Sequence, residues 1–88
     1  MIRCILIINY NHIKLDEKEK ENIIINMIEK SFNLLDMDFT KYENINNSGY
    51  FHFKAENEKD IDELFKSLYF GFGIDKSNNH IFRIDFLN

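Results

Sequence analysis

A chain of 88 residues is long enough for one folded domain but too short to hold a second independent hydrophobic core. Its nine Phe and four Tyr supply large apolar groups for that core, and zero Pro with only three Gly exclude a stiff linker or a low-complexity segment. A net charge of −4 argues against a partner held mainly through phosphate contacts, because such binding depends on Lys and Arg. We therefore expect one ordered domain over residues 1–88.

Cysteine use and the first residues favour a cytoplasmic protein. Cys4 stands alone and cannot form a disulfide within the chain, and no CxxC or Cys/His pair is present. The apolar run that opens the chain stops at Asn9, too early for the apolar core of a signal peptide or for a membrane span. We expect a protein of a reducing cytoplasm, either a cell's own or that of a phage-infected host, with no membrane contact.

The first half of the chain predicts a strand, a helix and a second strand. Residues 2–10 form a nearly unbroken apolar run rich in Ile, which is typical of a central strand. A helix is expected to begin at Asp16, where a capping box with Glu19 precedes an apolar stripe. That stripe consists of Ile24, Ile28, Phe32 and Leu35. Residues 37–44 alternate poorly, with Phe39 and Tyr42 on opposite faces, and this favours an edge strand.

The second half repeats the pattern after a turn expected at residues 45–49. Residues 50–55 alternate cleanly, with Phe51, Phe53 and Ala55 on one side. Asn57 can cap a second helix, which we expect Gly71 and Gly73 to end. Its apolar stripe consists of Ile61, Leu64, Phe65 and Leu68. After a loop at 75–79, residues 80–87 alternate again, with Phe82, Ile84 and Phe86 expected to point inward.

The order strand, helix, strand, strand, helix, strand is typical of ferredoxin-like domains. Two right-handed crossovers would place the first and third strands in the middle of the sheet and both helices on one face. We therefore predict an α+β fold of the ferredoxin-like βαββαβ type, with a four-stranded antiparallel sheet.

The face of this sheet without helices is the first candidate interaction surface. The residues expected to form it are Ile5, Ile7, Tyr50, His52, Ile81 and Arg83, with Arg3, Asn9, Lys54 and Asp85 around them. An apolar centre with a polar and aromatic rim often marks an interaction site. A small domain also exposes apolar area of this kind without any function, so both interpretations stay open.

Residues 48–53 of this face resemble the third-strand motif of RNA recognition motif domains, with Tyr50 and His52 at the positions that stack on bases. The resemblance implies binding of single-stranded RNA. Residues 5–9 of the first strand loosely resemble the companion motif of the same family. Three residues depart from the two patterns: Phe51 stands where the family keeps a small residue, Ser48 replaces a basic residue, and Leu6 in the first strand replaces an aromatic one. RNA binding is therefore the alternative hypothesis.

Acidic residues concentrate at the expected start of the second helix. They are Glu56, Glu58, Asp60, Asp62 and Glu63. Carboxylates in the first turn of a helix stabilise the helix dipole, so their placement has a purely structural explanation. The functional alternative is an acidic patch that docks onto a basic, nucleic-acid-binding groove of another protein.

No catalytic, cofactor or metal site is predicted. The chain has no glycine-rich phosphate loop, and the first strand ends on Asn9, which lacks the charge of an Asp that could hold a divalent metal. His12, His52 and His80 have no second ligand at a diagnostic spacing. Cys4 is expected to face the core, where a thiol is inert.

Small size, acidity and the lack of a catalytic motif resemble, in general character only, small phage-encoded inhibitors such as anti-CRISPR proteins, which share no common motif. This resemblance implies binding to a nucleic-acid-handling host complex. We therefore expect a non-enzymatic protein-binding module that acts by steric or electrostatic occlusion. The alternatives are a single-stranded RNA-binding domain and a structural homodimer.

Overall fold

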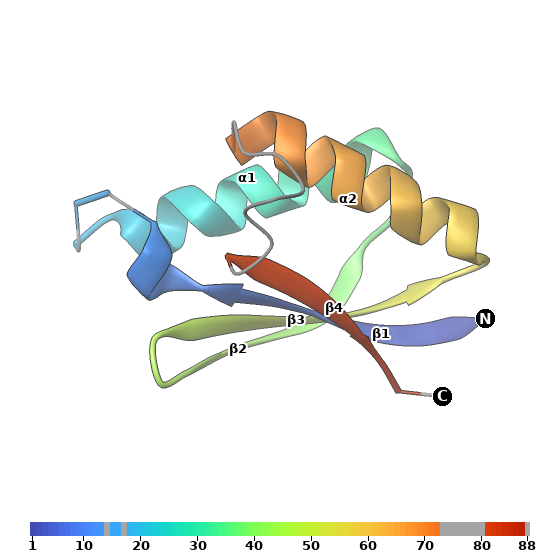
Figure 1. The fold of residues 1–88 in the computed structure, drawn as a ribbon, viewed down its shortest axis with the longest axis horizontal. Helices are drawn as coiled ribbons and strands as arrows, with labels where there is room; N and C mark the ends of the chain where they lie inside the picture. Colours follow the sequence, from blue (N-terminus) through green and yellow to red (C-terminus); the bar gives the residue numbers. More distant parts are fainter. Residues whose placement is uncertain (14, 17, 73–80, 88) are drawn as a thin grey trace.

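The computed structural model describes the chain except for residues 14, 17, 73–80 and 88. Within the described residues, four strands form one antiparallel sheet, and two α-helices lie on one of its faces (Figure 1). In chain order the elements are β1 (Ile2–Asn9), the short 3-10 helix η1 (Tyr10–His12), α1 (Lys20–Leu34), β2 (Phe39–Ile45), β3 (Ser48–Ala55), α2 (Glu58–Phe72) and β4 (Phe82–Phe86).

The sheet has the strand order β2-β3-β1-β4, which places the first and third strands in the middle as the sequence predicts. β1 and β3 pair along their whole length, from Ile2 opposite Ala55 to Asn9 opposite Ser48. β4 pairs with the other side of β1, and β2 with the other side of β3. The predicted α+β class and the four-stranded antiparallel sheet with two helices on one face are confirmed.

The core fills the space between the sheet and the two helices. Its buried side chains from the central strands are Cys4, Leu6, Ile8, Phe51, Phe53 and Ala55, and those from the helices are Ile24, Ile28, Phe32, Ile61, Leu64 and Leu68. Phe32 packs edge-on against Phe53, with ring centroids 5.2 Å apart, and joins α1 to the centre of the sheet. The predicted apolar stripes therefore do form the core, except that Leu35 and Phe65 are only partly buried.

The start of the first helix differs from its prediction. α1 begins at Lys20, and its N-cap residue Glu19 makes no side-chain hydrogen bond. The carboxylate of Asp16 instead accepts a hydrogen bond from the backbone N–H of Lys18, at 3.1 Å, in the turn ahead of the helix. The predicted capping box is wrong because Asp16 stabilises this local turn. The cap of the second helix is confirmed, since Asn57 Oδ1 accepts from the backbone N–H of Asp60 at 3.1 Å.

A bulge explains why the second strand alternates poorly. The register of β2 against β3 shifts between Phe39 and Lys41, so that Phe39 lies opposite Phe53 and Tyr42 opposite Phe51. Both side chains therefore lie on the helix side of the sheet, and their predicted placement on opposite faces is wrong. A β-bulge adds one residue to a strand and so changes which side chains share a face.

The turn between β2 and β3 is also shorter than predicted. Only Asn46 and Asn47 lie outside the two strands, with φ angles of 52° and 60°. Two successive residues with positive φ form the turn whose twist matches that of paired strands, and Asn tolerates this conformation better than most residues.

Two predictions near the C-terminal part of the chain are met only in part. Gly71, expected with Gly73 to end the second helix, lies inside the last turn of α2, which extends to Phe72. Phe86 lies opposite Cys4 and therefore points to the helix side as predicted, but it is 57% exposed because its strand lies at the edge of the sheet. Gly73, His80 and the predicted loop at 75–79 lie outside the described residues.

A polar cluster around Tyr10 joins η1, α1 and β2. The hydroxyl of Tyr42 donates to Glu21 Oε2 at 2.9 Å, so Tyr10 donates to the Tyr42 hydroxyl across 2.7 Å. Asn44 also donates its side-chain amide to the Glu21 carboxylate. Lys20 is buried despite its charge, and its Nζ donates to the backbone carbonyl of Tyr10 at 2.8 Å. The cluster holds the N-terminal end of α1 against the sheet.

Glycine at position 49 makes room for the ring of Tyr10. A Cβ atom added at Gly49 would lie 2.2 Å from Tyr10 Oη and 2.8 Å from its Cζ, both far inside van der Waals contact. Gly71 is a natural control, because a Cβ atom there would meet nothing within 4 Å.

We expect Gly49→Ala to lower the free energy of unfolding by about 1–3 kcal/mol, since the methyl group must displace a buried ring. Gly71→Ala should instead raise it, by up to about 1 kcal/mol, because Ala favours the helix. Urea denaturation followed by circular dichroism measures both changes. Equal stability of the Gly49→Ala variant and the wild type would show that Tyr10 does not need this space.

The tyrosine hydroxyls of this cluster make stability depend on alkaline pH. Burial raises the pKa of Tyr10 and, more strongly, that of Tyr42, whose pKa is raised further by the hydrogen bond that it donates to Glu21. Above pH ~10 the unfolded chain releases these protons while the folded chain retains them, so the free energy of unfolding must fall as the pH rises.

We expect Tyr42→Phe to weaken this pH dependence, because it removes one of the two hydroxyls and the partner of the other. Urea denaturation at several pH values between about 8 and 11 gives the slope for the wild type and the variant. The same slope in both proteins would contradict the assignment.

Candidate interaction surfaces

The face of the sheet opposite the helices, here called the open face, brings together the residues predicted for it. Ile5 lies between His52 on β3 and Asp85 on β4, and Ile7 lies between Tyr50 and Arg83 in the same way. Directly opposite residues of paired antiparallel strands point to the same face. The sixth predicted residue, Ile81, precedes β4, and its carbonyl accepts from the N–H of Asn9 at 2.8 Å.

The apolar centre of the open face is smaller than the sequence suggests. Ile7 is only 9% exposed although no described helix covers this face. Ile5, Tyr50 and His52 are partly buried. The residues around a shallow hollow at this end of the face are Ile7, Asn9, Ser48, Tyr50, Ile81, Phe82 and Arg83. The open face therefore offers a polar surface with aromatic edges and little exposed aliphatic area.

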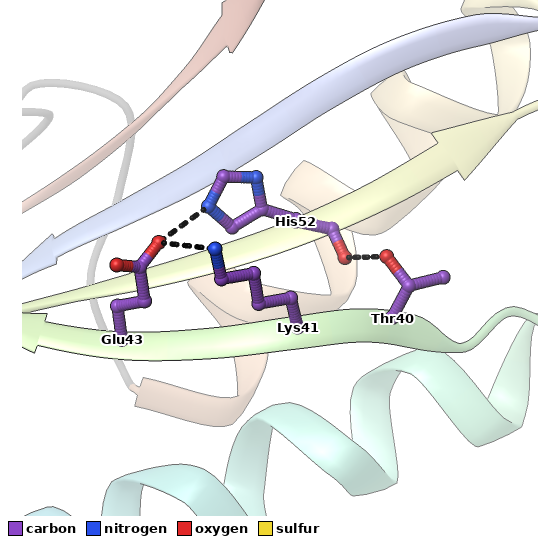
Figure 2. A network of polar contacts seen from close by, with 4 residues as sticks. All are labelled: Thr40, Lys41, Glu43 and His52. Carbon is purple, nitrogen blue, oxygen red and sulfur yellow. Dashed lines mark hydrogen bonds and ion pairs between the residues drawn. The ribbon is translucent and has the colours of Figure 1, made fainter.

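β2 adds a charged cluster to the open face. Glu43 Oε1 lies 3.2 Å from His52 Nε2 and 3.4 Å from Lys41 Nζ, and both side chains converge on this carboxylate (Figure 2). Thr40 Oγ1 donates to the backbone carbonyl of His52 at 3.2 Å. These contacts orient the His52 ring toward the β2 edge. The sequence analysis missed Lys41 and Glu43, because the bulge in β2 conceals their alternation.

The charge of the open face is opposite to that of the whole chain. Its positive side chains are Arg3, Lys41, Lys54 and Arg83, and its negative ones are Glu43 and Asp85. The face is therefore net positive, whereas the chain carries a net charge of −4. Most acidic residues lie on the helices and on the loops that precede or follow them.

Part of the predicted acidic patch joins two further carboxylates that the sequence analysis missed. Glu56 and Asp60 line one hollow with Asp36 and Asp38, and Lys54 lines it as well. We call these four acidic residues the acidic end. The pairing of β2 with β3 accounts for it, because the start of β2 lies beside the end of β3. The register of the β2–β3 hairpin places Asp38 near Glu56. A sequence analysis that had predicted this register would have found the acidic end.

The rest of the predicted patch is dispersed. Asp62 lies on a different side of α2, in a hollow with Phe65, Lys66 and Tyr69. Glu63 pairs with Lys59 across one helical turn, at 4.0 Å. Glu58 is exposed in the first turn of α2, where its carboxylate stabilises the helix dipole.

The nucleophilic and metal-binding residue types are scattered. Cys4 is fully buried in the core, and burial raises the pKa of its thiol. His12 is exposed in η1, His52 lies on the open face, and His80 falls outside the described residues. Within the described part of the chain, no group of three or more His, Cys, Asp or Glu side chains is arranged to hold a metal ion.

None of the helices among the described residues is both long and apolar enough to cross a membrane. No family model, no curated protein and no solved structure matches the chain. The functional argument therefore rests on the two charged surfaces that the fold creates, the open face and the acidic end.

Proposed function

We propose that this chain is a ferredoxin-like domain that acts as a non-enzymatic protein-binding module, and that its acidic end docks onto a basic groove of a nucleic-acid-handling complex. The strand order β2-β3-β1-β4, with both helices on one face, supports the ferredoxin-like assignment. The chain would inhibit its partner by occupying the groove, which requires binding alone and no reaction.

The acidic end is the observation that carries this proposal. Carboxylates in the first turn of α2 have a structural role at the helix dipole, but Asp36 and Asp38 follow the last turn of α1, where negative charge opposes the dipole. The fold nevertheless gathers them beside Glu56 and Asp60. Concentrated negative charge of this kind attracts a positive groove over several ångströms and speeds association with it.

Two double variants test the acidic end. Glu56→Gln/Asp60→Asn removes two of its charges, and Asp16→Asn/Glu19→Gln is the matched control. Each removes one Glu and one Asp charge near the start of a helix, but only the first lies at the acidic end. A partner captured by the tagged wild-type chain from nuclease-treated lysate of the source cell or host serves as the binding protein. We expect the first variant to slow association with this partner several-fold and the second to leave it nearly unchanged.

The wild-type association rate should also fall steeply with added salt, and DNA or RNA should compete with the chain for the captured protein. Equal effects of the two variants, or simultaneous binding of nucleic acid and chain, would contradict docking of the acidic end in a nucleic-acid groove.

A second candidate function, binding of single-stranded RNA, is favoured by the positive charge of the open face. Tyr50 and His52 lie on the central strand β3 among Arg3, Lys41 and Lys54, so aromatic rings and cations share one surface. Stacking of bases on such rings, with cations along the backbone, is how single strands bind without sequence preference.

Tyr50→Ala should weaken binding of a mixed-sequence, fluorescently labelled RNA by about 1–3 kcal/mol, since the ring would no longer stack on a base. Phe70→Ala is the matched control, because that aromatic side chain is 91% exposed on α2, away from the open face. Fluorescence anisotropy at low salt measures both. Absence of binding by the wild-type chain, or equal losses in the two variants, would rule out this candidate.

A further inference from the structure

β2 lies at one edge of the sheet, and no strand pairs with its outer side among the residues that the structure describes. The segments that lead into and out of β2, residues 35–38 and 46–47, belong to those described residues. The backbone hydrogen bonds that the described residues form outside the regular elements involve no residue of 39–45. A strand edge with unpaired N–H and C=O groups is a template for pairing with a further strand.

The hairpin turn shows which backbone groups of β2 point away from the sheet. Only two residues separate β2 from β3, so Ile45 exchanges hydrogen bonds with β3 where the turn closes. Backbone groups alternate in direction along a strand, so Glu43 and Lys41 also direct theirs toward β3. Tyr42 and Asn44 therefore direct their N–H and C=O groups toward the outer edge.

We propose that two copies of this chain form a two-fold symmetric dimer by antiparallel pairing of β2 with β2, centred on Tyr42. In this register Tyr42 lies opposite the partner's Tyr42, and the two residues exchange a pair of backbone hydrogen bonds. The two sheets become one continuous sheet. The pairing uses the β2 edge of both copies, so it closes at two chains.

Opposite charges select this register. Lys41 lies opposite the partner's Glu43, and Glu43 opposite the partner's Lys41, on the open face. These are positions without hydrogen bonds between the two copies, where side chains of antiparallel strands lie closest to each other. A shift of the register by two residues places Lys41 opposite the partner's Lys41 or Glu43 opposite the partner's Glu43. Like charges directly across a strand pair are unfavourable.

The side chains that the dimer needs are already in place in the single chain. Lys41 and Glu43 lie on the same face of β2, with side chains 63% and 38% exposed, and their charged groups are 3.4 Å apart (Figure 2). His52 Nε2 lies 3.2 Å from the Glu43 carboxylate and holds it on the open face. Tyr42 points to the other side of the sheet, where its hydroxyl donates to Glu21. Pairing of two copies therefore requires no rearrangement of the hairpin.

The length of the regular edge determines how strong the dimer is. A lysine on an edge strand commonly prevents pairing, but here Glu43 stands two residues from Lys41, so a second copy brings the opposite charge to each. The bulge between Phe39 and Lys41 ends the regular edge on one side, and the turn at Asn46 ends it on the other. Because the paired stretch is short, we expect the dimer to form at high protein concentration.

Charge reversal and charge exchange at these two positions test the proposal. Light scattering at protein concentrations up to about 1 mM should show the wild-type mass rise from the monomer value of 10.6 kDa toward twice that value. Lys41→Glu and Glu43→Lys should each raise the dissociation constant of the dimer by about tenfold or more, because like charges then face each other at both symmetric contacts. The double variant Lys41→Glu/Glu43→Lys restores opposite charges and should restore the dimer.

A mixture of the two single variants should form a mixed dimer, since the chain with two negative charges then faces a chain with two positive ones. Arg83→Glu is the control, because it reverses an exposed charge on β4 at the other edge of the sheet and should leave the dimer intact. Thermal unfolding of each variant shows that the domain itself remains folded. A wild-type chain that stays monomeric, single reversals that leave the dissociation constant unchanged, or a double variant that stays monomeric would each overturn the proposal.

Discussion

The register of β1 against β3 is the constraint on which the rest of the molecule depends. The two strands pair over their whole length, and this pairing places Leu6 with Phe51 toward the helices and Ile7 with Tyr50 toward the open face. A slip of one residue would move every side chain to the other side of the sheet. Burial of Phe51 and Phe53 under α1 and α2 makes any such slip costly, because large apolar side chains would then lie in water. The open face is therefore a consequence of the core.

The same constraint separates the charges. Each side chain on the open face lies between neighbours on adjacent strands. Lys and Arg side chains in such positions can cover those neighbours with their aliphatic stems while their charged groups stay in water. The helix layer favours acidic side chains in the first turns of α1 and α2, because carboxylates there interact favourably with the helix dipole. The result is a net positive sheet face on an acidic chain. Charge segregated in this way affects encounter with partners more than it affects the stability of the fold.

Much of the fold could be predicted from the sequence, because the apolar run at 2–10, the alternation at 50–55 and the apolar stripes of both helices outweigh local exceptions. The failures occur where one residue has an unexpected role. The carboxylate of Asp16 accepts from the N–H of Lys18 in a turn ahead of α1, so the helix begins at Lys20 and not at Asp16. The bulge near Lys41 hides the alternation of β2 and, with it, Lys41 and Glu43 as members of the open face. The acidic end forms because the start of β2 lies beside the end of β3. Its prediction would have required the register of the β2–β3 hairpin.

The two charged surfaces lie in different parts of the molecule and are compatible with one another. The acidic end is formed where β2 begins and α2 begins, whereas Arg83 of the open face lies on β4, at the opposite edge of the sheet from β2. Lys54 lies where the two surfaces meet, since it lines the acidic hollow and stands opposite Arg3 on the open face. Opposite charges on two sides of a small domain orient it in the field of a charged partner, so the acidic end would turn toward a basic groove and the open face away from it.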